Sequence, residues 1–146
     1  MKPYEFLDHT SEAKFRAYGE TLEEVLENSA KAMFAIMCDP ENVKSKITKK
    51  FEIEKESEDL KSLLFDFLDQ LIILKDSESF LLHDIEVKIE GNKLSAVCKG
   101  DRANDYPTSG DVKAPTYSEM LVEQKKAGKT SEAKESEWMT QVVVDV

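Results

Sequence analysis

The last six residues of the chain constrain its fold more than any other segment. Residues 141–146 read Gln-Val-Val-Val-Asp-Val, an apolar β-branched run with one acid. Chain ends usually fray and carry little structure, so a final segment this apolar is expected to be buried or docked as a strand. Such a strand brings the Asp145 side chain and a carboxylate on Val146 to one strand end.

The composition fits one compact domain over residues 1–146. Hydrophobic residues make up 40% of the chain, with only five Gly and four Pro, which suffices for a sizeable core. Cys38 and Cys98 each lie in an apolar pattern, so we expect buried thiols and a reducing, cytoplasmic setting. No run approaches the roughly 18 apolar residues of a membrane span, and we expect no membrane partner.

Two segments have the apolar spacing of amphipathic helices. The first begins at a capping box, Thr-Leu-Glu-Glu at residues 21–24, and ends before Asp39-Pro40. The second follows the polar residues Ser57-Glu58-Asp59 and carries a broad apolar stripe over residues 60–72. Both patterns predict α-helices that pack against a core.

Alternating apolar and polar side chains predict strands around these helices. The expected strands cover residues 4–7, 14–18, 49–53, 85–89, 94–98, 112–122 and 138–146. Gly91-Asn92 marks a hairpin turn, and residues 124–137, which hold Lys, Glu and small residues, predict a solvated loop. The fold class expected is α+β: two helices packed on a mixed, largely antiparallel β-sheet.

Common enzyme signatures are missing from the sequence. It contains no Gly-rich phosphate loop, paired-cysteine zinc spacing or nucleophile elbow. The formal net charge of −10 is the wrong sign for gripping a phosphate backbone, so direct nucleic-acid binding is not expected. Any nucleic acid is therefore expected to be held by a partner.

Oxygen donors at two distant points in the chain form the candidate site. Asp8 and Glu12 flank a polar turn near the N-terminus, and Asp145 and Val146 lie at the other end. If the first and last strands are neighbours, these carboxylates converge and need a proton, a basic side chain or a cation such as calcium. Spacing alone favours the plainer alternative that all of them are solvated.

Two further residues have open roles. His9 is a possible ligand or proton carrier, although a histidine at a strand-to-turn junction is more often a hydrogen-bonded structural residue. Lys113 stands alone in a strand with little charge, and it faces either an acid cluster or solvent.

The order of several short motifs resembles the archease family. The resemblance spans residues 4–146 and includes His9-Thr10-Ser11-Glu12, Val112-Lys113-Ala114-Pro115-Thr116-Tyr117 and the terminal Val144-Asp145-Val146. It implies a small α+β protein that is not an enzyme. The implied role is that of a cofactor for the GTP-dependent tRNA-splicing RNA ligase of the RtcB class, assisting guanylylation of the ligase and its multiple turnover.

The resemblance also implies a site and a second partner. In the family, the acid of a His-Thr-Ala-Asp motif binds calcium together with the C-terminal acid and carboxylate, which correspond to Glu12, Asp145 and Val146. Asp8, His9 and Lys113 are then candidates for support or partner contact. Family members are also linked, as chaperone-like modulators, to a tRNA cytosine-5 methyltransferase.

The chain departs from the family pattern at two positions, and two other classes of function stay open. Glu12 replaces an aspartate and lengthens the arm by one methylene, and Ser118 stands where histidine is common. One alternative is a small metal-dependent hydrolase that uses the same carboxylates to activate water. The other is a general chaperone without metal, which binds clients through exposed apolar surface.

Overall fold

The computed structural model describes residues 2–55, 59–125 and 137–146. Ser57 and Glu58, part of the predicted helix start, lie outside the described residues, as do residues 126–136 of the predicted solvated loop. Within the described chain, two helices and seven strands follow one another in the order β1, β2, α1, β3, α2, β4, β5, β6, β7. Short 3-10 turns lie at Pro40–Asn42 and Ala103–Asp105.

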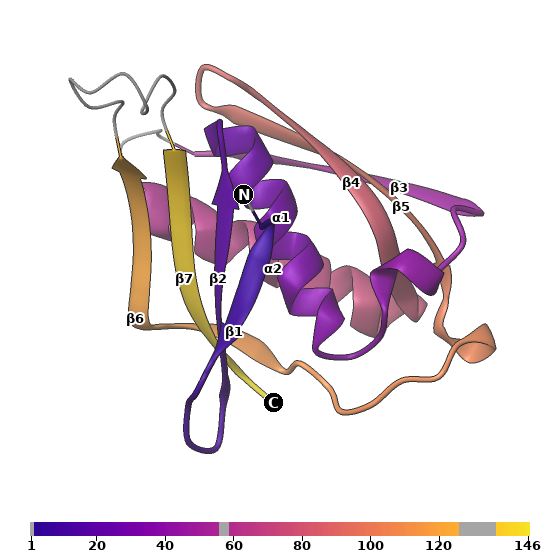
Figure 1. Ribbon diagram of the computed structural model, residues 1–146. Coiled ribbons are helices and arrows are strands. Elements are labelled where there is room, and N and C mark those ends of the chain that lie inside the picture. The colour runs from indigo at the N-terminus through magenta and orange to yellow at the C-terminus, as the bar shows by residue number, and fades with distance from the viewer. Residues whose placement is uncertain (1, 56–58, 126–136) are drawn as a thin grey trace.

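One sheet joins the two ends of the chain. Its order is β1-β2-β7-β6, and every neighbouring pair is antiparallel. The strands are β1 (Tyr4–Leu7), β2 (Ala13–Gly19), β7 (Glu137–Asp145) and β6 (Ala114–Lys125). The final strand therefore lies inside this sheet, between β2 and β6 (Figure 1).

The middle of the chain forms a second antiparallel sheet of order β3-β5-β4. Its strands are β3 (Ile47–Glu54), β5 (Lys93–Arg102) and β4 (Phe80–Glu90). The predicted hairpin is present, because β4 and β5 pair on either side of Gly91-Asn92. Gly91 has a positive φ of 59°, which glycine adopts at little steric cost.

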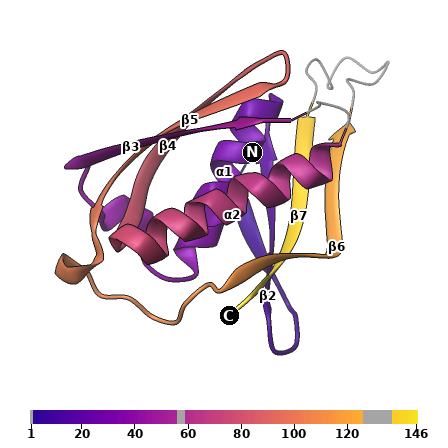
Figure 2. The same ribbon diagram turned by 180° about the vertical axis from the view of Figure 1, so that it is seen from behind.

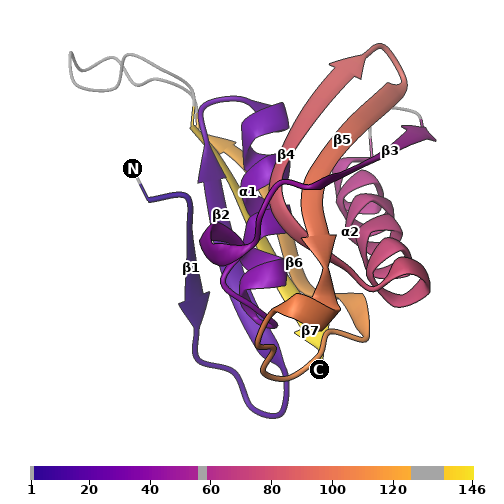
Figure 3. The ribbon, with the colours of Figure 1, turned by 90° about the vertical axis from the view of Figure 1, so that its right-hand side faces the viewer.

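The helices connect the two sheets. Helix α1 (Leu22–Ala35) packs on β2 and β7 of the first sheet and on β4 of the second, so it lies between them (Figure 3). Helix α2 (Leu60–Glu78) packs on β6, β4 and β3 and is seen in front of α1 in Figure 2. Both helices begin at predicted N-cap residues. The Thr21 side chain accepts a hydrogen bond from the Glu24 amide, and the Asp59 side chain accepts one from the Ser62 amide.

A continuous core fills the space between the sheets and helices. Its largest fully buried side chains include Phe15, Phe34, Phe67 and Phe80. Val142, Val143 and Val144 are 0% exposed, which confirms that the terminal run is buried as a strand. Gly19 lets β2 end against α1, because a Cβ there would lie 2.5 Å from the Val25 nitrogen.

The fold class is confirmed as α+β, with two helices on antiparallel strands. The strands divide into two sheets where one was expected, and no parallel pair is present among the described residues. Cys98 is buried and Cys38 is half-buried, and both thiols are free. Among the described residues, no helix is long and apolar enough to span a membrane.

Candidate cation site at paired strand ends

The predicted convergence of the two chain ends is set by strand register. Ala13 at the start of β2 pairs with Val144 of β7, and the residues just beyond that pair are Glu12 and Asp145. Ala13 and Val144 both face the core side, so the alternation of side chains places Glu12 and Asp145 on the outer face of the sheet. Two acids far apart in sequence are thus carried by neighbouring strand ends.

A third chain segment fixes the end of β7. The backbone amide of Lys113 donates a hydrogen bond of 2.8 Å to the carbonyl of Asp145, and Ala114 pairs with Asp145 in the ladder. Asp145 and Val146 are both exposed, Val146 at 45%. The expectation that the last residue is docked therefore holds for the strand up to Asp145, whereas Val146 itself lies in the solvent.

His9 is held by a hydrogen bond to an acid that the sequence analysis did not single out. Its Nε2 atom lies 2.9 Å from Oε2 of Glu119. Its Nδ1 atom is buried and makes no hydrogen bond, and it stands 3.8 Å from Oε1 of Glu12. This geometry supports the structural role for His9 and places the imidazole between two carboxylates.

Glu119 owes its position to a bulge in edge strand β6. The register of β6 against β7 shifts between Thr116 and Leu121, and Glu119 has a positive φ of 54°. Its carboxylate also accepts a hydrogen bond of 3.2 Å from the Lys14 ammonium. The hydrogen bonds from His9 and then from Lys14 lower the pKa of Glu119 below its ordinary value.

Gln141 connects this bulge to the neighbouring strands. Its Nε2 group donates to the Glu119 carbonyl at 2.7 Å, and its Oε1 atom accepts from Arg16 Nε at 2.9 Å. Gln141 is buried, so both of its hydrogen bonds satisfy groups that would otherwise be costly to remove from water. The outer face therefore carries a continuous polar network from β2 through β7 to β6.

Two predicted residues are not drawn into this network. Asp8 is exposed on the turn, and among the described residues it forms no ion pair. The Lys113 side chain is exposed as well, and its ammonium pairs with none of the acids that the structure describes. Lys113 contacts Asp145 through its backbone amide, and the positive charge of its exposed side chain acts on Asp111.

The donor chemistry of the strand ends fits a hard cation. The side chains of Glu12 and Asp145 are carboxylates, which are oxygen ligands of the kind that calcium prefers. Among the described residues, no group of three or more His, Cys, Asp or Glu side chains is already assembled as a metal site. In the part of the chain that the structure describes, Glu12 and Asp145 therefore lie at adjacent strand ends without forming an assembled metal site.

Comparison with known sequences identifies relatives over the whole chain. The sequence model of the Archease protein family matches residues 4–146. The chain is 36% identical to Protein archease of Pyrococcus abyssi, with 100% of both chains covered. It is also 36% identical to Protein archease of Methanosarcina mazei, with 99% of this chain and 97% of the relative covered.

Comparison with solved structures gives the same family. The fold is similar to the solution structure of Protein 1598 from Methanobacterium thermoautotrophicum, with a TM-score of 0.75. The two sequences are 31% identical, and the match covers 100% of both chains. The sequence comparisons and the structure comparison therefore identify the same family, and each covers nearly the whole chain.

Proposed function

The chain belongs to the archease family, and on that premise we propose that it is a non-enzymatic activator of a GTP-dependent tRNA-splicing RNA ligase of the RtcB class. It would promote guanylylation of the ligase and its multiple turnover in tRNA splicing. The observation that carries the proposal is the register of β2 and β7, which puts the partly buried Glu12 and the exposed Asp145 on one face at neighbouring strand ends. We place this activity in the cytoplasm.

Calcium is the proposed cofactor. Glu12, Asp145 and the carboxylate of Val146 would hold it, since all three belong to neighbouring strand ends. When bound, the ion offsets the mutual repulsion of these carboxylates and offers a Lewis-acid centre at the surface. Glu12 reaches one methylene further than the aspartate of the family motif, which suits an irregular oxygen shell.

The surrounding residues would position the ligands. His9, fixed by Glu119, presents its buried face to Glu12 and limits the directions in which that carboxylate can turn. Lys14 neutralises Glu119, so that this further acid adds little negative charge to the site. The exposed ammonium of Lys113 would contact the partner, and the exposed Asp8 would face it from the turn.

The charge of the chain supports a basic docking partner. A net charge of −10 attracts the positively charged nucleotide and nucleic-acid site of a ligase and steers encounter with it. Asp145 and Val146 are exposed and Glu12 is partly exposed at one end of the sheet, so a partner can reach the candidate site without local unfolding. We assign the bond-making chemistry to the ligase.

Multiple-turnover ligation by the cognate ligase tests the proposal. We expect stimulation by the wild-type protein, loss of stimulation in Asp145→Ala, and full stimulation in the matched control Glu90→Ala, which removes an exposed acid from the other sheet. Turnover of a phosphoester by the purified protein alone would contradict the proposal and favour a hydrolase. Stimulation of a tRNA cytosine-5 methyltransferase without any effect on the ligase would assign the protein to that client.

A further inference from the structure

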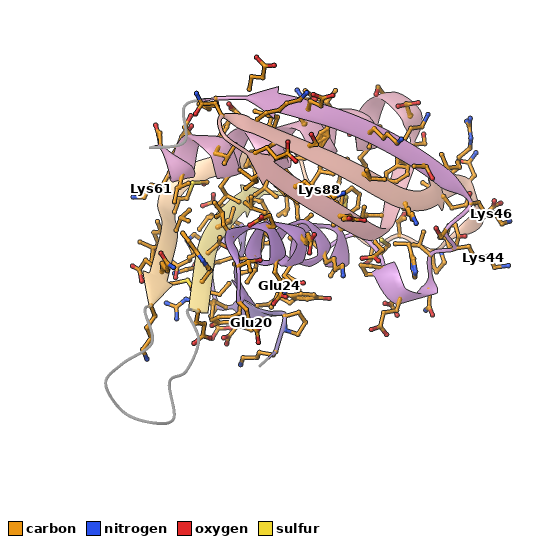
Figure 4. All side chains as sticks on the ribbon, turned by 90° about the horizontal axis from the view of Figure 1, so that it is seen from above. Glu20, Glu24, Lys44, Lys46, Lys61 and Lys88 are labelled. Carbon is orange, nitrogen blue, oxygen red and sulfur yellow. The ribbon has the colours of Figure 1, made fainter. Side chains whose placement is uncertain are left out.

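Four lysines line the outer face of the second sheet at one of its ends. They lie along β3, on the residues leading into it and on the paired strand β5, and we call them the basic strip: Lys44, Lys46, Lys50 and Lys99. Lys99 belongs to the strip because it pairs with Thr48, which sits between Lys46 and Lys50 on the same face. Figure 4 shows Lys44 and Lys46 projecting from this end of the molecule.

The backbone of the strip is anchored before the strand begins. The amide of Lys44 donates to the Tyr106 hydroxyl at 3.1 Å, and the amide of Lys46 donates to the Gly100 carbonyl at 2.9 Å. The Tyr106 hydroxyl in turn donates to Asp101 at 2.6 Å. Residues 46, 48 and 50 lie on one exposed face of this segment, so the Cα atoms of Lys46 and Lys50 are about 13 Å apart with Thr48 between them.

The lysines of the strip are in excess over nearby free acids. Lys44, Lys50 and Lys99 form no ion pair with any residue that the structure describes, and Lys46 reaches only Asp101, at 4.0 Å. Asp101 is 5% exposed and already accepts two hydrogen bonds.

Other acids of this region have their own partners. Glu78 pairs with Lys49 at 2.6 Å, and Asp84 pairs with Lys31 at 3.0 Å. Asp105 is exposed, and the acids beside the strip on the same face have lysine partners: Glu52 pairs with Lys93 at 2.5 Å and Glu86 with Lys88 at 3.8 Å. A positive surface therefore persists on a chain whose net charge is −10.

The chemistry of the strip favours phosphate over a protein surface. Lysine is depleted at protein interface cores, which need buried aromatic or aliphatic anchors, and no large apolar side chain is exposed among these residues. Thr48 is exposed between Lys46 and Lys50 on the same face, and Ser45 is exposed beside Lys44 and Lys46 in the sequence; hydroxyl side chains are ordinary phosphate donors. Lysines also protect edge strands from aggregation, but that role does not require Lys99, which lies on the central strand β5.

We infer that the basic strip binds the phosphate backbone of RNA. The net charge of −10 disfavours binding of RNA by the chain as a whole. The lysines of the basic strip give this end of the sheet a local positive charge, which provides a site for it. The contact is expected to be weak and independent of sequence, since it consists of ammonium groups and hydroxyls. It stands apart from the carboxylates of the candidate cation site and does not depend on ligase activation.

Anisotropy of a fluorescein-labelled RNA hairpin, titrated with the protein alone at several potassium chloride concentrations, tests this inference. We expect log K to fall with log salt with a slope of about −3 to −4, at about 0.9 per phosphate contact. Lys44→Gln/Lys46→Gln is expected to make the slope shallower by about 2. The matched control Lys61→Gln/Lys88→Gln removes two exposed lysines outside the strip and should leave the slope unchanged.

Three results would overturn the inference. They are equal salt slopes for both double variants, absence of binding at low salt, and binding of the strip to labelled polyglutamate in preference to RNA, which would indicate an acidic protein partner. Thermal unfolding of each variant, followed by circular dichroism, distinguishes loss of the RNA contact from unfolding of the protein. Ligase stimulation measured on the same proteins keeps the two proposals distinct, because either can fail without the other.

Discussion

His9 and Glu119 lie 110 positions apart in the sequence, yet His9 Nε2 lies 2.9 Å from Glu119 Oε2. The contact joins the turn before β2 to the bulge in β6. Because the same turn carries Glu12, a bulge in an edge strand helps to set the position of a proposed cation ligand. Contacts made by the residues around a metal ligand commonly determine how well that ligand is oriented.

Glu119→Gln is expected to destabilise the protein at neutral pH. The lowered pKa of Glu119 means that its charged form stabilises the fold above the pKa of the unfolded state. That contribution is lost as pH falls through the pKa of the folded state. The difference in unfolding free energy between wild type and variant, measured by urea titration, should therefore shrink in acid. A difference independent of pH, or one shared by Glu90→Gln, would contradict this assignment.

Asp145→Asn is expected to weaken calcium binding on the order of tenfold or more, because it removes one anionic ligand. A glycine added after Val146 moves the terminal carboxylate and should have a similar effect. Isothermal titration with calcium measures both. Glu86→Gln, an exposed acid of the other sheet, serves as the control. Unchanged calcium affinity in both site variants would show that these carboxylates do not bind the cation.

The two free thiols predict a loss of stability at alkaline pH. Burial raises the pKa of Cys38 from about 9 to about 11 and that of Cys98 to about 12. Between pH 9 and these values the unfolded chain releases thiol protons that the folded chain keeps, so stability falls as pH rises. The slope is on the order of 1 kcal/mol per pH unit per thiol. Cys38→Ser should show a shallower decline in chemical denaturation, and an identical decline would refute the assignment.

Gly19→Ala is expected to destabilise the fold by about 1–3 kcal/mol, because the new methyl group would overlap the start of α1. The nearest atom is backbone, the Val25 nitrogen at 2.5 Å, and it cannot turn away as a side chain can. Thermal and urea unfolding measure the loss. Lys88→Ala, on an exposed position of β4, should change stability by less than about 0.5 kcal/mol. Equal stability of the two variants would show that β2 and α1 can separate without cost.

Local patterns in the sequence were sufficient to predict most elements. The capping box at Thr21, the Gly91-Asn92 hairpin and the final valine run each predict a structure that depends on neighbouring residues alone. The division of the strands into two sheets depends on which distant strands pair, and alternation along one strand contains no such information. Helix α1 can separate two sheets only because both present apolar faces to it.

The site was predictable in part for the same reason. The meeting of Glu12 and Asp145 was predicted on the condition that the first and last strands are neighbours, whereas the last strand β7 pairs with the second strand β2, which Glu12 precedes. Glu119 was missed, since a bulge and a positive φ in a non-glycine residue leave no signal in one sequence. The sequence pattern also could not show that the backbone of Lys113 anchors Asp145 while its side chain is exposed.

Guanylylation of the cognate ligase, followed with labelled GTP, shows whether the strand-end carboxylates take part in activation. We expect that wild-type protein with calcium accelerates labelling of the ligase, that Asp145→Ala does not, and that Glu90→Ala matches wild type. Circular dichroism should show all three proteins folded. Equal acceleration by folded Asp145→Ala and wild type would contradict the account, because the strand-end carboxylates would then have no part in activation.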